Sequence, residues 1–123
     1  MSGALLPLRD EAEFERALQR PVAFVFKHST RCGTSTAALI EVRQYAASHS
    51  DVPVYLVDVI EDRALARRIA ARVGVPHESP QAILLAEGTA VWSAAHFDVS
   101  VTALEEAAAR AADERAAGRA SNP

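Results

Sequence analysis

The single cysteine of this 123-residue sequence, Cys32, stands where a thiol can act as a nucleophile. It follows the apolar, strand-like run from Val22 to Phe26 and precedes a segment, 34–48, with helical periodicity. A thiol at a helix N-terminus faces unpaired backbone N–H groups and the positive end of the helix dipole, and both stabilise the thiolate. Because the thiolate is the form that attacks disulfides, the position predicts thiol–disulfide exchange, although a lone cysteine is more commonly an unreactive core residue.

Basic side chains near Cys32 in the sequence favour the reactive interpretation. Arg31, Lys27 and His28 precede it in a polar segment, from Lys27 to Gly33, that we expect to be a loop. A nearby cation favours the charged form of a thiol, so Arg31 and Lys27 are expected to stabilise the thiolate. His28 is either a base or cationic neighbour of the thiol, or a surface residue that holds the loop.

The run Cys32-Gly33-Thr34-Ser35 has the length of a C-x-x-C redox motif, with serine in the place of the second cysteine. This signal is weaker than C-x-x-C, because serine is also common at helix starts for capping reasons. We expect Ser35 to donate a hydrogen bond to the sulfur. A single thiol cannot close its own disulfide, so Cys32 would form a mixed disulfide that an external thiol must resolve.

Pro80 is the second candidate site residue, because it directly precedes the strand-like run 81–85. In thioredoxin-like folds a cis-proline at this place lies opposite the active cysteine, and the residue before it pairs its backbone with the substrate. Those roles would fall to Pro80 and Ser79. Only about 5–6% of X-Pro bonds are cis, but the separation from Cys32 leads us to predict a cis Ser79–Pro80 bond.

The rest of the sequence predicts the elements that position these residues. The run 22–26 is apolar throughout rather than alternating, as in a central strand that is covered on both faces. Parallel strands joined by helices, then a hairpin and a closing helix, predict an α/β fold whose central mixed sheet has helices on both faces. The expected elements are a short strand at 5–8, helix 10–20, strand 22–26, helix 34–48, strand 54–59, a helix from 61 to its stop at Gly74, strands 82–86 and 90–94 around a Glu87-Gly88 turn, and a helix from Thr102, with Glu105 completing a capping box, to about Ala117.

Length and charge limit the possible functions. The chain suits one domain, 1–117, followed by a flexible tail, 118–123. Thirteen basic against sixteen acidic residues disfavour a nucleic-acid partner, and no apolar run is long enough to cross a membrane. One cysteine excludes an internal disulfide, and no ligand spacing supports a metal site. Without a secretory signal, a cytoplasmic location is the default expectation.

Four other side chains belong to residue types that take part in chemistry or in packing. A catalytic role is the less favoured interpretation of His77 and His96. Trp92 and Phe97 are expected to pack the hairpin and the last helix, and a partner-binding patch is the less favoured use.

Four stretches together resemble the YtxJ-type monothiol bacilliredoxins. They are Phe26–Cys32, Asp58–Arg63, His77–Gln81 and Val91–Asp98, in the family's order, and the resemblance covers roughly residues 8–110. It implies a thioredoxin-like fold and a nucleophilic Cys32 that removes bacillithiol from S-bacillithiolated proteins. Bacillithiol would be a thiol co-substrate rather than a bound cofactor, and another redoxin could help to regenerate Cys32.

The chain departs from that family after the cysteine, where Gly33-Thr34-Ser35 replaces the usual proline-isoleucine-serine. The nucleophile is intact, but the departure could change its pKa or the fit of partners. Gly33 also gives the cysteine-glycine-x-serine pattern of monothiol glutaredoxins. Two alternatives therefore stay open: an iron–sulfur carrier in which two chains bridge a cluster through Cys32, and a redox-inactive thioredoxin-like adaptor.

Overall fold

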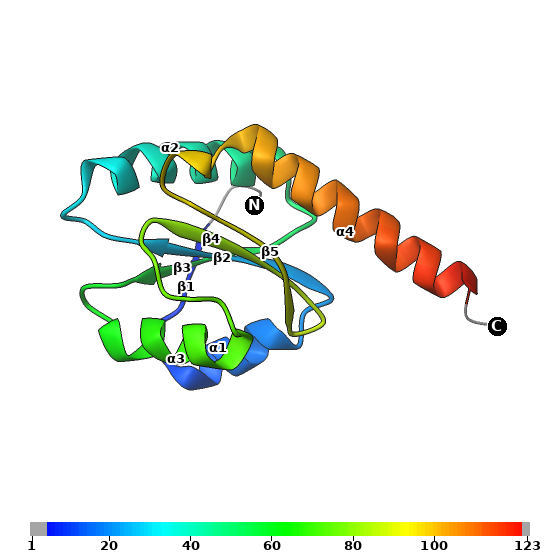
Figure 1. Cartoon of the computed structure of the whole chain (residues 1–123), viewed down its shortest axis with the longest axis horizontal. Helices are drawn as coiled ribbons and strands as arrows, with labels where there is room; N and C mark the ends of the chain where they lie inside the picture. Colours follow the sequence, from blue (N-terminus) through cyan, green and yellow to red (C-terminus); the bar gives the residue numbers. More distant parts are fainter. Residues whose placement is uncertain (1–4, 122–123) are drawn as a thin grey trace.

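A five-stranded mixed sheet forms the centre of the fold in the computed structural model, which describes residues 5–121 (Figure 1). The strand order is β1-β3-β2-β4-β5; β1 and β2 are parallel to β3, β4 is antiparallel to β2, and β5 is antiparallel to β4. Helices α1 and α3 cover one face, and α2 and α4 cover the other, as predicted (Figure 1). The elements are β1 (Leu5–Pro7), α1 (Glu11–Leu18), β2 (Val22–His28), α2 (Gly33–Ser48), β3 (Val54–Asp58), α3 (Arg63–Val73), β4 (Gln81–Ala86), β5 (Thr89–Ala95), the 3-10 turn η1 (His96–Asp98) and α4 (Val101–Ser121).

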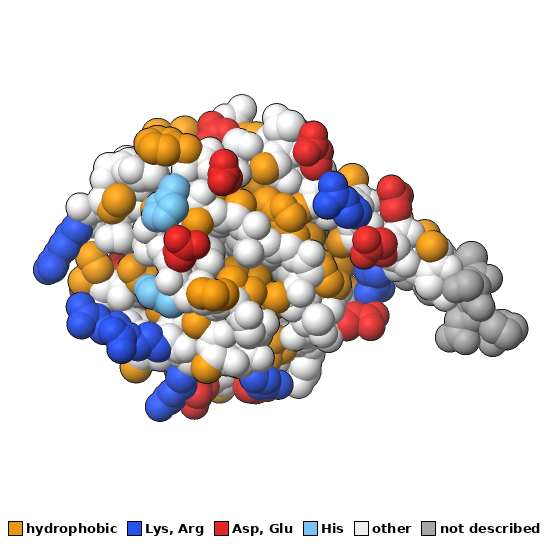
Figure 2. All heavy atoms as spheres, in the orientation of Figure 1, with side chains coloured by type: hydrophobic (Ala, Val, Ile, Leu, Met, Phe, Trp, Pro, Cys, Tyr) orange, Lys and Arg blue, Asp and Glu red, His pale blue; other side chains and the backbone are white. Residues whose placement is uncertain are grey.

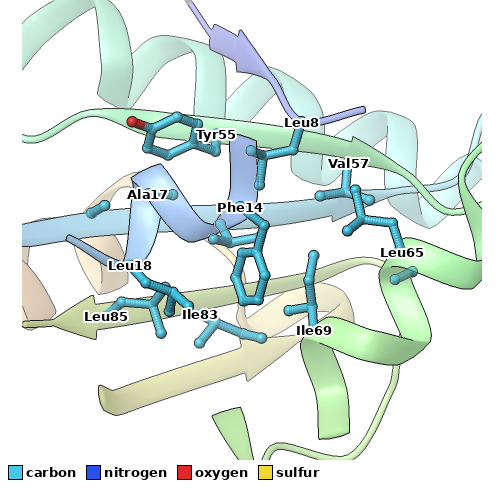
Figure 3. Packing of buried hydrophobic residues seen from close by; sticks show 13 residues of the cluster. Leu8, Phe14, Ala17, Leu18, Tyr55, Val57, Leu65, Ile69, Ile83 and Leu85 are labelled. Carbon is cyan, nitrogen blue, oxygen red and sulfur yellow. The ribbon is translucent and has the colours of Figure 1, made fainter. Parts of the chain in front are cut away.

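Strand β2 holds the two halves of the core together, because its successive side chains point to opposite faces of the sheet. Val25 lies in the cluster under α1 and α3, and Phe24 lies in the cluster under α2 and α4. In Figure 3, Phe14 of α1 and Ile69 of α3 point into the first cluster, toward the sheet. Each such buried side chain stabilises the fold by about 1.5–3 kcal/mol, which fixes the sheet on which the site stands.

The β4–β5 hairpin is confirmed, and so is part of the aromatic packing prediction. Glu87 and Gly88 both have positive φ, 50° and 81°, which matches the twist of a tight two-residue turn. Trp92 packs edge-on against Phe24, with ring centroids 6.1 Å apart. Phe97 does not pack: its side chain is 81% exposed on η1. That part of the prediction is wrong, because the chain turns into η1 directly after β5 and carries Phe97 outside the core.

Strand β2 is longer than predicted, since it continues through Lys27 and His28. These residues pair with Val57 and Asp58 of β3, and Lys27 also pairs with Gln81 of β4. The prediction of a loop from Lys27 onward is therefore wrong. Backbone pairing on both sides extends the strand, and the two polar side chains are buried beside partners of their own.

Helix α4 differs from its prediction at both ends. Its first turn is capped by Ser100, whose Oγ accepts a hydrogen bond from Ala103 N at 3.1 Å, rather than by Thr102. Glu105 instead pairs with His49 at 2.8 Å. The helix continues to Ser121, through most of the predicted tail, since alanine and arginine are strong helix formers. Residues 1–4 of the predicted domain and 122–123 of the predicted tail lie outside the described residues.

No helix within residues 5–121 is both long enough and apolar enough to cross a membrane.

Candidate active site

Cys32 is the N-cap residue of α2, as the sequence predicts, and its side chain is partly exposed. Its backbone is extended, and its carbonyl accepts the first helical hydrogen bond, from Thr36 N at 3.1 Å. The main-chain amide of Ser35 lowers the pKa of the Cys32 thiol, partial burial opposes this, and the amide and hydroxyl of Thr34 lower it further. The helix start therefore favours the thiolate, which is the nucleophilic form.

The two basic side chains predicted to stabilise the thiolate lie in different surroundings. Arg31 is exposed beside Cys32, and its effect on the thiolate stays a prediction. Lys27 is completely buried in β2, and its Nζ lies 3.1 Å from His77 Nδ1. By strand alternation it points to the opposite face of the sheet from His28. The expectation that Lys27 stands in a loop beside the thiol is wrong, because the strand extends through it.

Ser35 contacts the thiol through its main chain. Its side chain is fully buried, and its Oγ accepts a hydrogen bond from Ser29 N at 2.9 Å. The same Oγ lies 2.7 Å from His28 Nδ1. The predicted hydrogen bond to the sulfur comes from the Ser35 amide, while the hydroxyl joins the Cys32 loop to β2 through Ser29 and His28.

His28 supports this loop through Ser35 and is itself buried, with 8% of its surface exposed. Its ring stacks on Phe26, with centroids 5.9 Å apart. Burial lowers the pKa of His28, the charge of Asp58 raises it, Arg43 lowers it, and the Ser35 hydrogen bond raises it. A lowered pKa keeps the imidazole neutral near neutral pH, so His28 acts here as a hydrogen-bonding support of the loop rather than as a cation beside the thiol.

The bond between Ser79 and Pro80 is cis, as predicted. Pro80 is buried and directly precedes Gln81, which pairs with Lys27 near the end of β2. The cis-proline segment therefore lies at the same end of the sheet as the β2–α2 loop that carries Cys32 (Figure 1). The structure brings the predicted substrate-pairing residues, Ser79 and Pro80, to the thiol end of the fold.

The 3-10 turn η1 lies beside the cis-proline segment and carries Phe97, which is not among the site residues predicted from the sequence. His96 N donates to Pro80 O at 3.0 Å, and His96 Nε2 pairs with Glu78 Oε1 at 3.3 Å. The turn also lies against α2. It presents Phe97 as an exposed aromatic side chain beside the cis-proline segment. An aromatic residue in a polar segment directly after a strand was the signal available in the sequence.

The surface around the thiol end is open and carries positive charge. Figure 2 shows arginine side chains around the end where, in Figure 1, the β2–α2 connection and the start of α3 lie. Gly33 is exposed, and a Cβ added there would meet no atom within 4 Å. Glycine thus leaves free space beside Cys32. Among the described residues, no group of three or more His, Cys, Asp or Glu side chains could hold a metal ion.

Comparisons with known proteins agree with this geometry. Residues 6–104 match the family described as monothiol bacilliredoxin BrxC. One solved structure, provisionally described as an oxidoreductase with a thioredoxin fold, is 32% identical, with a TM-score of 0.80 over 85% of this chain and 94% of that one. A thioredoxin variant from Halobacterium salinarum NRC-1 is 23% identical (TM-score 0.70; 85% and 88% covered). Mitochondrial thioredoxin 3 from Saccharomyces cerevisiae is 18% identical (TM-score 0.69; 84% and 92% covered). The last two likenesses show the shared fold, and together the comparisons support a thiol–disulfide oxidoreductase role.

Proposed function

Because the chain belongs to the monothiol bacilliredoxin family, we propose that it removes bacillithiol from S-bacillithiolated proteins through a mixed disulfide on Cys32. The observation that carries this proposal is the position of the Cys32 thiol together with its lowered pKa. Cys32 is partly exposed at the start of α2, and main-chain amides lower its pKa. A redox-inactive adaptor would need no such thiolate-stabilising arrangement.

The reaction needs two exchange steps. In the first, the Cys32 thiolate attacks the bacillithiol sulfur of the protein–bacillithiol disulfide, so that a Cys32–bacillithiol disulfide forms and the substrate protein leaves as a thiolate, which takes up a proton. In the second, the thiolate of another bacillithiol molecule attacks the bacillithiol sulfur of that adduct. Bacillithiol disulfide leaves and the Cys32 thiolate is restored. Another redoxin could replace the second bacillithiol as the attacking thiol.

The chain's own groups have separate tasks in these steps. The amides of Ser35 and Thr34 stabilise the negative charge on the Cys32 sulfur each time it leaves as thiolate. The cis Ser79–Pro80 segment offers the Ser79 main chain to the extended backbone of the substrate protein. Ser35 replaces a resolving cysteine, so the adduct on Cys32 persists until an external thiol arrives.

Transfer of bacillithiol to Cys32 tests the proposal. A synthetic peptide whose one cysteine carries bacillithiol in disulfide linkage is mixed with the reduced protein, and intact-mass and peptide-mapping spectra are recorded. We expect one bacillithiol adduct per chain on Cys32, none on a Cys32→Ser variant, and release of the adduct by added bacillithiol. Failure to accept bacillithiol from a peptide that dithiothreitol reduces readily would overturn the proposal. Colour and bound iron in anaerobically purified protein would instead favour the iron–sulfur carrier.

A further inference from the structure

Lys27 is a buried cation without an ionic partner among the described residues. Its side chain is 0% exposed in the central strand β2, and none of the ion pairs within residues 5–121 includes it. Burial of an unpaired ammonium group is strongly unfavourable, and burial lowers the pKa of Lys27 to about 8. Because burial of the charged Lys27 lowers the stability of the fold, its presence suggests that this residue serves another role.

The side chain of Lys27 reaches the segment that leads to the cis-proline. Its Nζ lies 3.1 Å from Nδ1 of His77, which is otherwise exposed. An ammonium group can only donate, so His77 Nδ1 is the acceptor. Segment 75–78 has no helix or strand of its own, which makes contacts of this kind important for its position.

Gln81 of β4 contacts the same segment from the neighbouring strand. It is paired with Lys27 in the sheet register and is 2% exposed. Its Nε2 donates to Pro76 O at 3.0 Å, while its buried Oε1 has no hydrogen-bond partner. Two adjacent side chains of the sheet thus hold two successive residues, Pro76 and His77, just before Ser79 and Pro80.

Partial burial and two neighbouring cations keep His77 able to accept this hydrogen bond. Burial, the charge of Lys27 and that of Arg67 on α3 lower the pKa of His77, and the charge of Glu78 raises it. The imidazole is therefore neutral near neutral pH, with Nδ1 free of a proton.

We propose that Lys27 is a positioning residue for the protein substrate: through His77 it holds segment 75–80 so that the Ser79 main chain is presented to the incoming backbone. This inference rests on the proposed function for its substrate. Lys27 does not touch the reacting sulfurs, and a small disulfide that makes no backbone pairing should be insensitive to it.

Steady-state kinetics with two substrates test the inference. We compare Lys27→Met with the matched control Val25→Ala, which alters a fully buried residue on the same face of β2. For the bacillithiolated peptide, Lys27→Met should raise KM about tenfold and leave kcat within about twofold, as expected for loss of a hydrogen bond that orders the binding segment. For bis(2-hydroxyethyl) disulfide, both variants should match the wild type. Equal KM values for the peptide in wild type and Lys27→Met, or equal losses with both substrates, would overturn the inference.

The partner residue provides a rescue experiment. His77→Leu should raise KM for the peptide as Lys27→Met does, and His77→Gln, whose side-chain oxygen can accept from Lys27, should restore most of the affinity. A result in which His77→Gln behaves like His77→Leu would overturn the role given to the Lys27–His77 contact.

Amide hydrogen exchange separates failure of this inference from failure of the proposed function, because it needs no substrate. Segment 75–80 of the reduced protein should exchange at least about tenfold faster in Lys27→Met than in wild type or Val25→Ala. Unchanged exchange overturns the inference even if the wild type transfers bacillithiol. Faster exchange confined to this segment supports the loop-holding role even if the transferred thiol proves to be a different one.

Discussion

Replacement of Lys27 by methionine should make the protein more stable near neutral pH, although the same change is expected to weaken substrate binding. An ordinary lysine titrates near pH 10.5, and burial lowers the pKa of Lys27 to about 8. Since one pKa unit corresponds to about 1.4 kcal/mol, the charged side chain destabilises the folded state by about 3 kcal/mol. Methionine fills a similar volume without charge but loses the hydrogen bond to His77, worth about 1.5 kcal/mol. The expected net gain in unfolding free energy is about 1–2 kcal/mol at about pH 6.5.

The sign of the pH dependence follows from the lowered pKa in the folded state. Between about pH 8 and pH 10.5 the unfolded chain binds the Lys27 proton and the folded chain does not, so the stability of the wild type rises with pH in this range. The stability difference between Lys27→Met and wild type should therefore fall by about 2 kcal/mol from about pH 6.5 to about pH 9.5. Titrating groups other than His77 cancel in this difference, because both proteins contain them in the same surroundings; His77 does not, because the charge of Lys27 lowers its pKa in the wild type alone.

Guanidinium chloride unfolding of both proteins at the two pH values measures this difference. Val25→Ala is the control: it should lose about 2 kcal/mol of stability, by the same amount at both pH values, because no charge is altered. If the difference in unfolding free energy between Lys27→Met and wild type stayed constant with pH, the argument that Lys27 is a buried cation would be refuted.

Three further predictions concern the thiol, the surface and the hairpin. The ultraviolet absorbance of the Cys32 thiolate should titrate at a lower pH in the folded protein than in guanidinium chloride, because the amides at the helix start lower the pKa of the thiol only in the folded protein. Equal titration midpoints would remove the basis of the proposed function. Phe97→Ser should change the unfolding free energy by less than about 0.5 kcal/mol, since the residue is 81% exposed, but it should raise KM for the bacillithiolated peptide. An unchanged KM would show that Phe97 takes no part in docking. Gly88→Ala should lower the unfolding free energy by about 1–2 kcal/mol in thermal or denaturant unfolding, because φ is 81° and the new Cβ would lie 3.1 Å from Leu18 O. The control Gly33→Ala meets open space and should cost less than about 1 kcal/mol. Equal losses of stability in the two variants would contradict the role of the turn.

Local patterns in the sequence were enough to predict most of the elements and the place of the thiol. Continuous apolar residues predicted a central strand, a helical repeat predicted the helix that follows, and the short polar link between them put Cys32 at the helix start. Glu87-Gly88 predicted the hairpin turn, since adjacent positive φ values are needed there. These features depend on local backbone preferences and on the spacing of apolar residues, which are properties of neighbouring positions in the chain.

Long-range contacts set which polar side chains are buried and what these side chains touch, and local sequence patterns do not show them. Lys27 is a charged residue next to a polar run in the sequence. The neighbouring residues do not show that β3 and β4 pair on both sides of it, or that His77, fifty residues away, accepts its hydrogen bond. Ser35 reaches the sulfur by its amide rather than its hydroxyl because His28 and Ser29 lie where the hydroxyl points. Burial and pairing depend on residues distant in sequence, so a pattern read along one chain segment predicts the strand but not the partner of each polar side chain.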